Sequence, residues 1–350
     1  MKKLIIFLLV GSVLFSGCII SFGSKRSAGT AGVFKSFDKG NSWTEKNLFL
    51  HSGGIGSIAG INVLSLNFDP SDNSAIYLAS DSSGLFYSYD GADSWLKVRQ
   101  IGNGKIESVA IDSVNKCIIY SSFANTILKT IDCGRSWSEV YIDTRIDKSI
   151  TALAVDSYDN LIVYAGNTAG DILKSVNGGG NWQVIARFEN PIKKIMIDQN
   201  DTRIIYVPTE RKGIFKTTNG GNDWKEINDG LRQYSGSFEY KNLIFDKSTR
   251  DNLLLVAKYG LLWTEDGGET WEPIPLITPP TTTDIYSVAI NPQNNLEIYY
   301  TTKSTFYKTT DGGKNWITKR LPSAAVPAHM EVDPKNPNII YLGFFNPSKK

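Results

Sequence analysis

The sequence predicts an all-β fold, a seven-bladed β-propeller built from four-stranded antiparallel blades, and two observations predict it. An eight-residue motif that closes with tryptophan occurs seven times, and successive closing tryptophans lie 42 to 52 residues apart. A fixed period in this range is the signature of a repeat architecture. Between the motifs, short runs of β-branched and aromatic residues alternate with turn residues, as strands do. No long segment shows the 3.6-residue apolar period of an amphipathic helix.

The amino terminus has the composition of an export signal. Two lysines precede an apolar run that ends at Phe15, and small residues follow ahead of Cys18. We therefore predict a signal peptide over residues 1–17, which is too short to be a good membrane-spanning helix. The ending from Leu14 to Cys18 resembles a bacterial lipobox, with Phe15 in place of the usual leucine. The resemblance implies cleavage before Cys18 and acylation of its thiol. The alternative is a simple secretion signal with an incidental cysteine.

The rest of the chain divides into a tether, a propeller and a tail. Residues 18–31 are rich in serine, glycine and alanine and are predicted to form a flexible tether. The repeats fill residues 32–345, and residues 346–350 form a short tail. This organisation predicts an exported, membrane-anchored lipoprotein of a bacterial cell envelope, either periplasmic or at the cell surface. We expect the propeller to be a monomer.

The charge balance excludes some partners. Formal net charge is +2, from 37 basic and 35 acidic residues, and two of the lysines lie in the predicted signal. The mature chain is therefore close to neutral and lacks the basic stripe that phosphate binding needs, so nucleic acid is not an expected partner. The chain has only two histidines, with no cysteine close to either in the sequence. We therefore expect neither a metal nor another cofactor.

Each repeat divides into four short strands. The first ends in an acid or amide, and the second carries an apolar residue followed by tyrosine, except that one repeat has Leu255 there. The third comes just before the motif, and the closing tryptophan begins the fourth. Two and four residues before the terminal acid or amide, many repeats have small residues. Small residues suit the crowded centre of a ring of sheets, so we predict that the first strand is innermost.

The two ends of the chain predict how the ring closes. The chain starts with a third strand, residues 32–36, and finishes with a first and a second strand, residues 329–332 and 339–342. Together with the fourth strand that follows the first motif, these strands would make one complete blade. We therefore expect the terminal strands to share one blade, which makes the count seven.

The repeated motif joins the third strand to the fourth. Its third position is aspartate or asparagine, whose side chain can accept hydrogen bonds from backbone N–H groups of its own turn. Its fifth position is glycine, which adopts positive φ without steric cost, except that Ala92 takes this place in the second copy. The closing tryptophan offers a large apolar body for packing between blades. The third and closing positions are Asp38 and Trp43, Asp90 and Trp95, Asp132 and Trp137, Asn177 and Trp182, Asn219 and Trp224, Asp266 and Trp271, and Asp311 and Trp316.

Asn177 and Asn219 keep the turn chemistry but would spoil a metal or acid–base role, so the motif is expected to be structural. The motif resembles the Asp box, also called the BNR repeat, whose pattern is Ser/Thr-x-Asp-x-Gly-x-x-Trp. Families built from it include sialidases, xyloglucanases, sortilin-type luminal domains and the photosystem II assembly factor of chloroplasts and cyanobacteria. The resemblance covers residues 32–345. It implies Asp boxes that are structural turns at the blade periphery, away from the ligand face.

Among these families, the chain is most similar to the assembly factor in blade number and size. Sortilin-type domains carry ten blades, and xyloglucanases usually extend over two propellers. The assembly factor is exported, and in cyanobacteria it is a lipoprotein. Its arginine patch has no counterpart that we can find in this near-neutral sequence. The resemblance therefore implies the architecture but not the partner.

Two cysteines, Cys117 and Cys133, lie in one repeat. If Phe123 to Thr126 form the hairpin loop, the two cysteines face each other across neighbouring strands, within the range of a disulfide. An exported compartment permits the bond. We hypothesise a Cys117–Cys133 disulfide, and the alternative is a pair of buried thiols.

The second-to-third and fourth-to-first loops are expected to form the ligand face. The longest fourth-to-first connections are residues 47–60, 228–239 and 275–284. A glycine-rich run, residues 53–56, is expected to be a flexible loop rather than a phosphate loop, because no helix follows it. The candidate ligand-face residues are His51, Arg145, Glu210, Arg211, Arg232, Tyr234 and Tyr259.

Catalysis is not supported by a residue pattern. A sialidase needs three arginines around the substrate carboxylate and a tyrosine–glutamate nucleophile pair. Arg145, Arg211 and Arg232 match that number but not the Arg-Ile-Pro context of the family. We therefore assign no catalytic residue and expect a non-enzymatic scaffold that binds a protein partner. The alternative is a carbohydrate-binding or glycoside hydrolase propeller with a glycan ligand.

Overall fold

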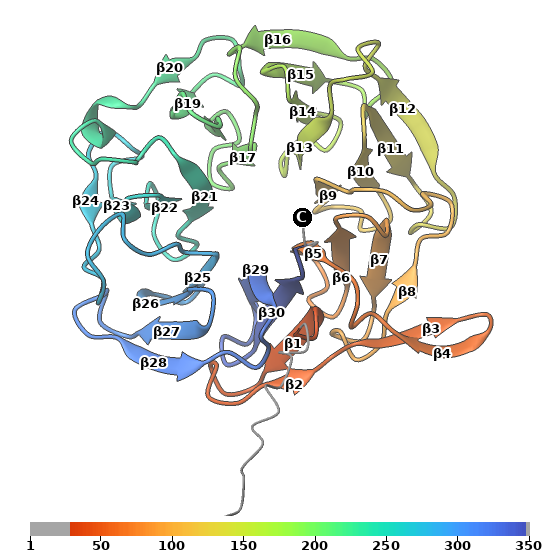
Figure 1. The fold of residues 1–350 in the computed structure, drawn as a ribbon. Coiled ribbons are helices and arrows are strands. Elements are labelled where there is room, and N and C mark those ends of the chain that lie inside the picture. The colour runs from red at the N-terminus through yellow and green to blue at the C-terminus, as the bar shows by residue number, and fades with distance from the viewer. Residues whose placement is uncertain (1–28, 348–350) are drawn as a thin grey trace, which may run out of the picture.

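The computed structural model describes residues 29–347 and is a ring of seven four-stranded antiparallel sheets around a central axis (Figure 1). Apart from the short 3-10 helix Asp229–Leu231, its regular elements are strands. The predicted fold class, with seven blades of four strands, is confirmed. Across residues 29–347, no helix is long and apolar enough to cross a membrane. The predicted signal peptide, Cys18 and most of the predicted tether lie outside the described residues.

The seven blades follow one another along the chain, each built from the inside outward. Blade 1 contains β5 (Val63–Phe68), β6 (Ile76–Ser80), β7 (Leu85–Ser88) and β8 (Leu96–Lys97). Blade 2 contains β9 (Val109–Ile111), β10 (Ile119–Phe123), β11 (Thr126–Thr130) and β12 (Ser138–Ile142). Blade 3 contains β13 (Ile150–Val155), β14 (Val163–Asn167), β15 (Asp171–Ser175) and β16 (Gln183–Arg187). Blade 4 contains β17 (Met196–Ile197), β18 (Ile205–Pro208), β19 (Ile214–Thr217) and β20 (Lys225–Glu226). Blade 5 contains β21 (Tyr240–Phe245), β22 (Leu253–Ala257), β23 (Gly260–Thr264) and β24 (Glu272–Pro273). Blade 6 contains β25 (Ser287–Asn291), β26 (Asn294–Thr301), β27 (Thr305–Thr309) and β28 (Ile317–Arg320).

The seventh blade closes the ring, as predicted. It contains β29 (Val326–Val332), β30 (Ile340–Phe345), β1 (Gly32–Ser36) and β2 (Thr44–Glu45), and β1 pairs with β30. The described end of the predicted tether also contacts this region. Asn346 Nδ2 donates to the carbonyl oxygen of Gly29 at 2.8 Å, and Ser323 Oγ donates to that of Thr30 at 2.6 Å. Residues 29–31 therefore pack against the propeller instead of belonging to a free tether.

The first strand of every blade is innermost, as the pattern of small residues predicts (Figure 1). The residues four positions before the terminal acid or amide all line the axial channel: Ser65, Ser108, Ala152, Lys194, Asn242, Ser287 and His329. The apolar core lies between neighbouring blades rather than within one. Tyr164 and Ile172 of blade 3, for example, pack with Ile205 and Phe215 of blade 4. Each blade therefore depends on its neighbours for burial, as in other repeat proteins.

The Asp box forms a compact turn held by its own side chains. In the sixth copy, Thr264 Oγ1 donates to Asp266 Oδ1 at 2.7 Å and accepts the N–H of Gly268 at 3.0 Å. Asp266 Oδ1 also accepts the N–H of Thr270 at 2.9 Å. The indole N–H of Trp271 donates to the carbonyl oxygen of Gly268 at 3.1 Å. The turn therefore satisfies backbone groups that the bend removes from the sheet.

Two successive positions of this turn adopt positive φ, whereas the sequence pattern predicts positive φ at the fifth position alone. The fourth position has φ values near +60 to +70°, and it includes the non-glycine residues Lys39 (+58°) and Cys133 (+59°). Ala92 at the fifth position has φ of +72° and is fully buried. At the same position, a Cβ on Gly268 would lie 2.5 Å from Ile227 Cδ1 of the preceding blade. The corresponding neighbour of Ala92 is Lys46, which turns outward to pair with Asp93 at 2.6 Å.

A tyrosine and a lysine of one blade donate hydrogen bonds to the Asp box of the next, and we call this pair of contacts the clasp. In blade 4, Tyr206 Oη and Lys216 Nζ both donate to the carbonyl oxygen of Gly267, at 3.2 and 2.9 Å. Lys216 Nζ also lies 5.1 Å from the centre of the Tyr206 ring. The same clasp joins Tyr341 and Lys35 to Gly91, Tyr120 and Lys129 to Gly178, and Tyr164 and Lys174 to Gly220. The recurring tyrosine of the sequence is therefore an inter-blade contact.

Three interfaces replace this clasp. Between blades 1 and 2, Tyr87 takes the lysine position opposite Tyr77, and Tyr89 Oη, which lies 3.4 Å from Tyr77 Oη, donates to Cys133 O at 3.3 Å.

In blade 5 the tyrosine position holds Leu254, which pairs with Trp263 at the lysine position, so the assignment of Leu255 to this position from the sequence is wrong by one residue. Leu254 has no polar group, and the Trp263 indole N–H donates to Glu265 at 3.3 Å. Between blades 6 and 7, the ion pair of Lys39 with the buried Glu297 at 2.7 Å takes over.

Residues 47–60 contain a β-hairpin where the sequence predicted a loop, which corrects that expectation. β3 (Leu48–His51) pairs with β4 (Gly54–Ser57), and the hairpin projects from the rim beside blade 1 (Figure 1). Its tip turns at Ser52 and Gly53, so the glycine-rich run belongs to a strand and its turn. The fold of this hairpin depends on its neighbour, because Leu50 N–H donates to Trp95 O at 2.9 Å.

The cysteine-bearing hairpin differs by one residue from the predicted register. The loop contains only Ala124 and Asn125, because Phe123 pairs with Thr126. Cys117 and Cys133 therefore lie just beyond the paired strands, where Cys133 N–H donates to Cys117 O at 3.2 Å. Their Sγ atoms are in bonding contact. The disulfide remains a proposal, which mass spectrometry of the intact protein under non-reducing conditions tests.

Candidate ligand-binding face

A polar cavity of about 500 Å³ lies on the axis at the end where the inner strands begin. The Asp boxes lie at the other end, because the third strand of each blade runs parallel to the first. The channel strands supply the lining of the cavity, so its chemistry changes from blade to blade. Cations, carboxylates, amides and hydroxyls all contribute: Lys193, Lys194, Lys241, His329, Glu107, Glu331, Asn67, Asn242, Ser65, Ser108 and Ser287.

The deep part of the cavity holds charged groups of both signs. Lys194 Nζ donates to Leu243 O at 3.0 Å and to Asn242 Oδ1 at 3.3 Å. Burial lowers the pKa of Lys194, and the charge of Glu331 opposes this shift. Burial would raise the pKa of Glu331, but its contact with His329, 3.2 Å away, and the charges of nearby lysines outweigh that effect and lower it. The opposite charges of Lys194 and Glu331 therefore stabilise each other in this part of the channel.

Ion pairs surround the mouth of the cavity. Lys241 lies 2.7 Å from Asp284, and its hydrogen bond and charge lower the pKa of Asp284. Lys193 pairs with Glu210 at 3.3 Å, and Lys105 Nζ lies 2.6 Å from Glu107. These side chains are partly exposed, so each pair contributes about 1 kcal/mol or less to stability. They do supply charges of both signs that a ligand can reach.

The candidate residues chosen from the sequence do not form one site. Tyr234 and Tyr259 do meet, with ring centres 4.9 Å apart, and Tyr234 Oη donates to Trp271 O at 2.7 Å. Glu210 is at the cavity mouth through its pair with Lys193.

The other candidates have local partners or stand apart. Arg211 is exposed, and Arg232 pairs with the exposed Asp229 at 3.3 Å. His51 belongs to the projecting hairpin, where its Nδ1 accepts the N–H of Gly53 at 3.1 Å. Neither Arg232 nor His51 lines the axial cavity.

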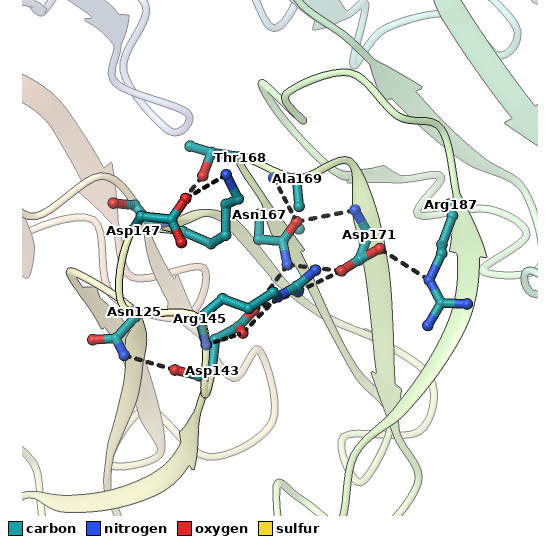
Figure 2. Close-up of polar contacts among 12 residues, drawn as sticks. Asn125, Asp143, Arg145, Asp147, Asn167, Thr168, Ala169, Asp171 and Arg187 are labelled. Atoms are coloured by element: carbon teal, nitrogen blue, oxygen red, sulfur yellow. Dashed lines mark hydrogen bonds and ion pairs between the residues drawn. The ribbon is translucent and has the colours of Figure 1, made fainter.

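Arg145 is the centre of a clamp between blades 2 and 3 (Figure 2). Its guanidinium donates to both oxygens of Asp143, at 2.9 and 2.7 Å, and to Asp171 Oδ2 at 2.6 Å. Asn167 Nδ2 lies between the same carboxylates, and Arg187 reaches Asp171 from the other side at 3.3 Å. The hydrogen bonds from Arg145 lower the pKa of Asp143.

This clamp joins the fourth-to-first connection of blade 2 to the second-to-third turn of blade 3. Asp143 and Asp171 are both nearly inaccessible, with 3% and 5% of their side chains exposed. Because Arg145 already occupies both carboxylates, the pair is not arranged to act as general acid and nucleophile. The grouping of Arg145, Arg211 and Arg232 around one substrate carboxylate is likewise not favoured.

Sequence reasoning missed the channel residues that give the cavity its character. Lys194, Asn242, His329 and Glu331 occupy positions where other repeats carry serine or alanine. These departures from the residues at the same position of other repeats are visible in the sequence. The small residues at these positions predicted only which strand is innermost. Lys193 and Lys241 gave no comparable signal, since they precede the periodic positions.

Within residues 29–347, no group of three or more metal-ligating side chains is close enough to hold an ion. The side chains of the axial cavity instead provide hydrogen-bond donors and acceptors together with charges. Such a site can hold a polar chain of mixed charge.

Comparisons with known proteins give a family match over part of the chain. A family model described as photosynthesis system II assembly factor YCF48 matches residues 188–324, which is less than half of the sequence. No curated protein sequence matches. The matching segment extends from the end of blade 3 to the end of blade 6.

Solved structures share the fold at low sequence identity. YCF48 from Cyanidioschyzon merolae has a TM-score of 0.62 at 15% identity, covering 83% of this chain and 97% of that one. A structure of YCF48 bound to a D1 peptide has a TM-score of 0.61 at 16% identity, covering 83% and 94%.

Two enzymes are similar over part of their length. GH74 enzymes from Niastella koreensis and Xanthomonas campestris, the latter a xyloglucanase, each have a TM-score of 0.66 at 17% identity. Each comparison covers 81% of this chain and 51% of the enzyme, so this chain spans about half of their length. The chain is thus a seven-bladed propeller of the Asp-box, or BNR, type.

Proposed function

We propose that this chain is a lipid-anchored, non-enzymatic scaffold of the cell envelope, whose propeller binds an extended segment of a partner protein at the axial cavity. The cavity itself carries the proposal. It has about 500 Å³ of space and is open on the face away from the Asp boxes, and its lining offers donors, acceptors and both signs of charge. A peptide presents all of these groups on one narrow chain, so it suits such a lining.

The comparisons support a peptide ligand. One similar structure is YCF48 with a D1 peptide bound. The segment that matches the YCF48 family model also supplies Lys193, Lys194, Lys241 and Asn242 to the cavity. The identity of the peptide does not transfer from a protein that is 16% identical.

A photocrosslinker tests the proposal on intact cells. Benzoylphenylalanine at Arg211, exposed on the ligand face, should yield a discrete adduct with one protein. The same group at Val176 is the matched control, because Val176 is 65% exposed in the fourth Asp box at the opposite end. We expect Lys194→Glu to abolish the adduct from position 211. No adduct at 211, or equal adducts from both positions, would contradict a protein-binding ligand face.

Membrane attachment through Cys18 is part of the same proposal and has its own test. Acyl chains contribute roughly 0.8 kcal/mol per buried methylene, and stable anchoring needs more than one chain or signal. Radiolabelled palmitate should be incorporated into the chain, and Cys18→Ser should abolish the label and release the protein from membranes. A labelled Cys18→Ser variant would exclude Cys18 as the acylation site.

The GH74 structures favour a second candidate, a propeller that binds or hydrolyses a glycan. Hydrolysis needs one carboxylic acid and one carboxylate free to reach the glycosidic bond. On this face, Asp143 and Asp171 are occupied by Arg145, and Glu210 and Asp284 face lysines. Xyloglucan and a panel of fluorogenic glycosides decide between the candidates. Turnover that disappears in Glu210→Gln would exclude the scaffold.

A further inference from the structure

The projecting hairpin creates a second concave surface, on the outer edge of the ring and apart from the axial cavity. β3 follows the edge of blade 1 only briefly: Trp95 N–H donates to Leu48 O and Leu50 N–H donates to Trp95 O, both at 2.9 Å. Beyond these contacts the hairpin leaves the blade (Figure 1). The space between the hairpin and the outer edge of blade 1 is a groove of about 500 Å³. Gly134 and Arg135 of the next Asp box also contribute to it.

The groove has a short open stretch of strand edge along one side, at the backbone of Lys97, because β3 already pairs at Trp95 and Arg99 O accepts the N–H of Gly102 at 3.3 Å. Val98 N–H donates to Leu85 O at 2.9 Å, which directs the backbone groups of Val98 inward to β7. Alternation along an antiparallel strand then directs the N–H and C=O of Lys97 outward, into the groove. Such an edge can accept another extended chain by strand addition.

The side chains of this edge alternate in character. Leu96 and Val98 are apolar, whereas Lys97 and Arg99 are basic. Arg135 adds a third basic side chain, and Lys97 Nζ donates to Asn103 Oδ1. The other lining residues include Phe49 and Leu50 but no aspartate or glutamate. Among residues 29–347, no carboxylate lies within ion-pair distance of Lys97, Arg99 or Arg135. The groove is therefore cationic in a chain that is close to neutral.

We propose that this groove, which we name the hairpin groove, binds an acidic protein segment as an added β-strand along β8. An added strand that alternates apolar and acidic residues places an apolar side chain over Leu96, which is 37% exposed, whereas Val98 is already buried in the core. It places its carboxylates beside Lys97, Arg99 and Arg135. The terminal segments outside the described residues cannot supply this strand, since their charged residues are all basic: Lys2, Lys3, Lys25, Arg26, Lys349 and Lys350. The occupant that we propose is an acidic segment of another protein.

Fluorescence anisotropy with defined peptides tests the proposal on the complete chain. The probe is fluorescein-labelled (Val-Glu)4-Val, and (Val-Lys)4-Val is the control of opposite charge. A third peptide carries N-methyl groups on the backbone edge that would pair with β8. We expect binding of the acidic peptide, at least tenfold weaker binding of the N-methylated one, and no binding of the basic one.

Arg99→Glu combined with Arg135→Glu should weaken binding of the acidic peptide at least tenfold. Position 135 tolerates an acid, because the equivalent sixth position of other Asp boxes holds Asp93 and Glu269. Arg320→Glu, on the exposed outer strand of blade 6, is the matched control and should bind as the unchanged protein does. If the double variant unfolds at a lower temperature, Lys97→Gln is the substitute and should weaken binding severalfold.

Several outcomes would overturn the proposal. Equal binding of the acidic and basic peptides, or of the acidic peptide by the double variant, would exclude charge recognition. Undiminished binding of the N-methylated peptide would exclude strand addition. Binding of phosphatidylglycerol vesicles in place of the acidic peptide, lost in the double variant, would identify the hairpin groove as a membrane-contact surface. Because Arg99 and Arg135 do not line the axial cavity, these results do not depend on the function proposed for that cavity.

Discussion

The outer end of each blade and the axial channel differ in how strictly they follow the repeat. At the outer end, seven Asp boxes make nearly the same contacts, and four of the interfaces use the same tyrosine–lysine clasp. Along the channel, equivalent positions hold serine in blade 2, lysine in blade 4 and histidine in blade 7. Positions that pack between identical neighbours are held to one chemistry. Positions that face the open axis are free to vary, and function can use that freedom.

The comparison predicts that changes at the outer end affect stability and changes in the channel affect binding. Trp271→Ala should have the largest effect. Trp271 is buried and its indole N–H is bonded to Gly268, so truncation should lower the free energy of unfolding by about 3–5 kcal/mol. Urea denaturation of the variant and the unchanged protein measures this loss. A loss below about 1 kcal/mol would show that the Asp-box tryptophan is not a packing anchor.

Gly268→Ala should come next, with a loss of about 2–4 kcal/mol in the free energy of unfolding. The residue has φ of +95°, which costs a side chain about 1–2 kcal/mol. Its Cβ would also press on Ile227 of the preceding blade. Gly102→Ala is the control: φ is +75° but nothing lies within 4 Å of the added Cβ, so only the backbone penalty should remain.

Removing the clasp should have a smaller effect. Tyr206→Phe deletes one of two donors to Gly267 O, and the loss should be about 1 kcal/mol. Adding Lys216→Met should cost about 1–3 kcal/mol more, because that oxygen then has neither donor. Thermal and urea unfolding of the single and double variants measure the coupling. Purely additive losses would contradict a shared acceptor.

Acid should weaken the Asp boxes that carry aspartate. Hydrogen bonds from the Ser136 side chain and backbone lower the pKa of Asp132 to about 2, and those from the Asn315 backbone and side chain lower that of Asp311 to about 2. Folded pKa values below the ordinary 3.8 mean that this stabilisation is present above pH 4. It is lost as pH falls towards 2.

The midpoint of thermal unfolding should therefore fall between pH 4 and pH 2. Asparagine does not titrate and already occupies this position in two boxes, at Asn177 and Asn219. Asp132→Asn with Asp311→Asn should make the fall shallower. An unchanged slope would mean that other carboxylates govern acid unfolding.

A channel substitution should have the smallest effect on folding. Lys194→Met removes a partly buried charge and two hydrogen bonds while keeping most of the side-chain length. Glu331 keeps its contact with His329 at 3.2 Å, so its carboxylate is not left without a partner, and we expect a loss of about 1 kcal/mol or less in the free energy of unfolding. The same variant should weaken the binding proposed for the axial cavity. A large loss of stability would place Lys194 with the structural residues.

The sequence by itself determined the repeat, the number of blades, the order of strands and the closure of the ring. Each of these depends on local patterns that recur: the Asp box, the tyrosine column and the small residues of the inner strand. A repeated unit meets the same neighbours every time, so its sequence is enough to infer its contacts.

Only the tertiary structure decided which non-repeating residues meet. Arg145 is bound to Asp143 and Asp171 from two blades, and Lys194 faces Glu331 across the channel. The hairpin of residues 48–57 forms against Trp95, far along the chain. These contacts join parts of the chain with no shared period, because closing the ring brings distant strands to one axis and one rim. That is why the blades could be predicted from the sequence, and why the axial cavity and the hairpin groove could not.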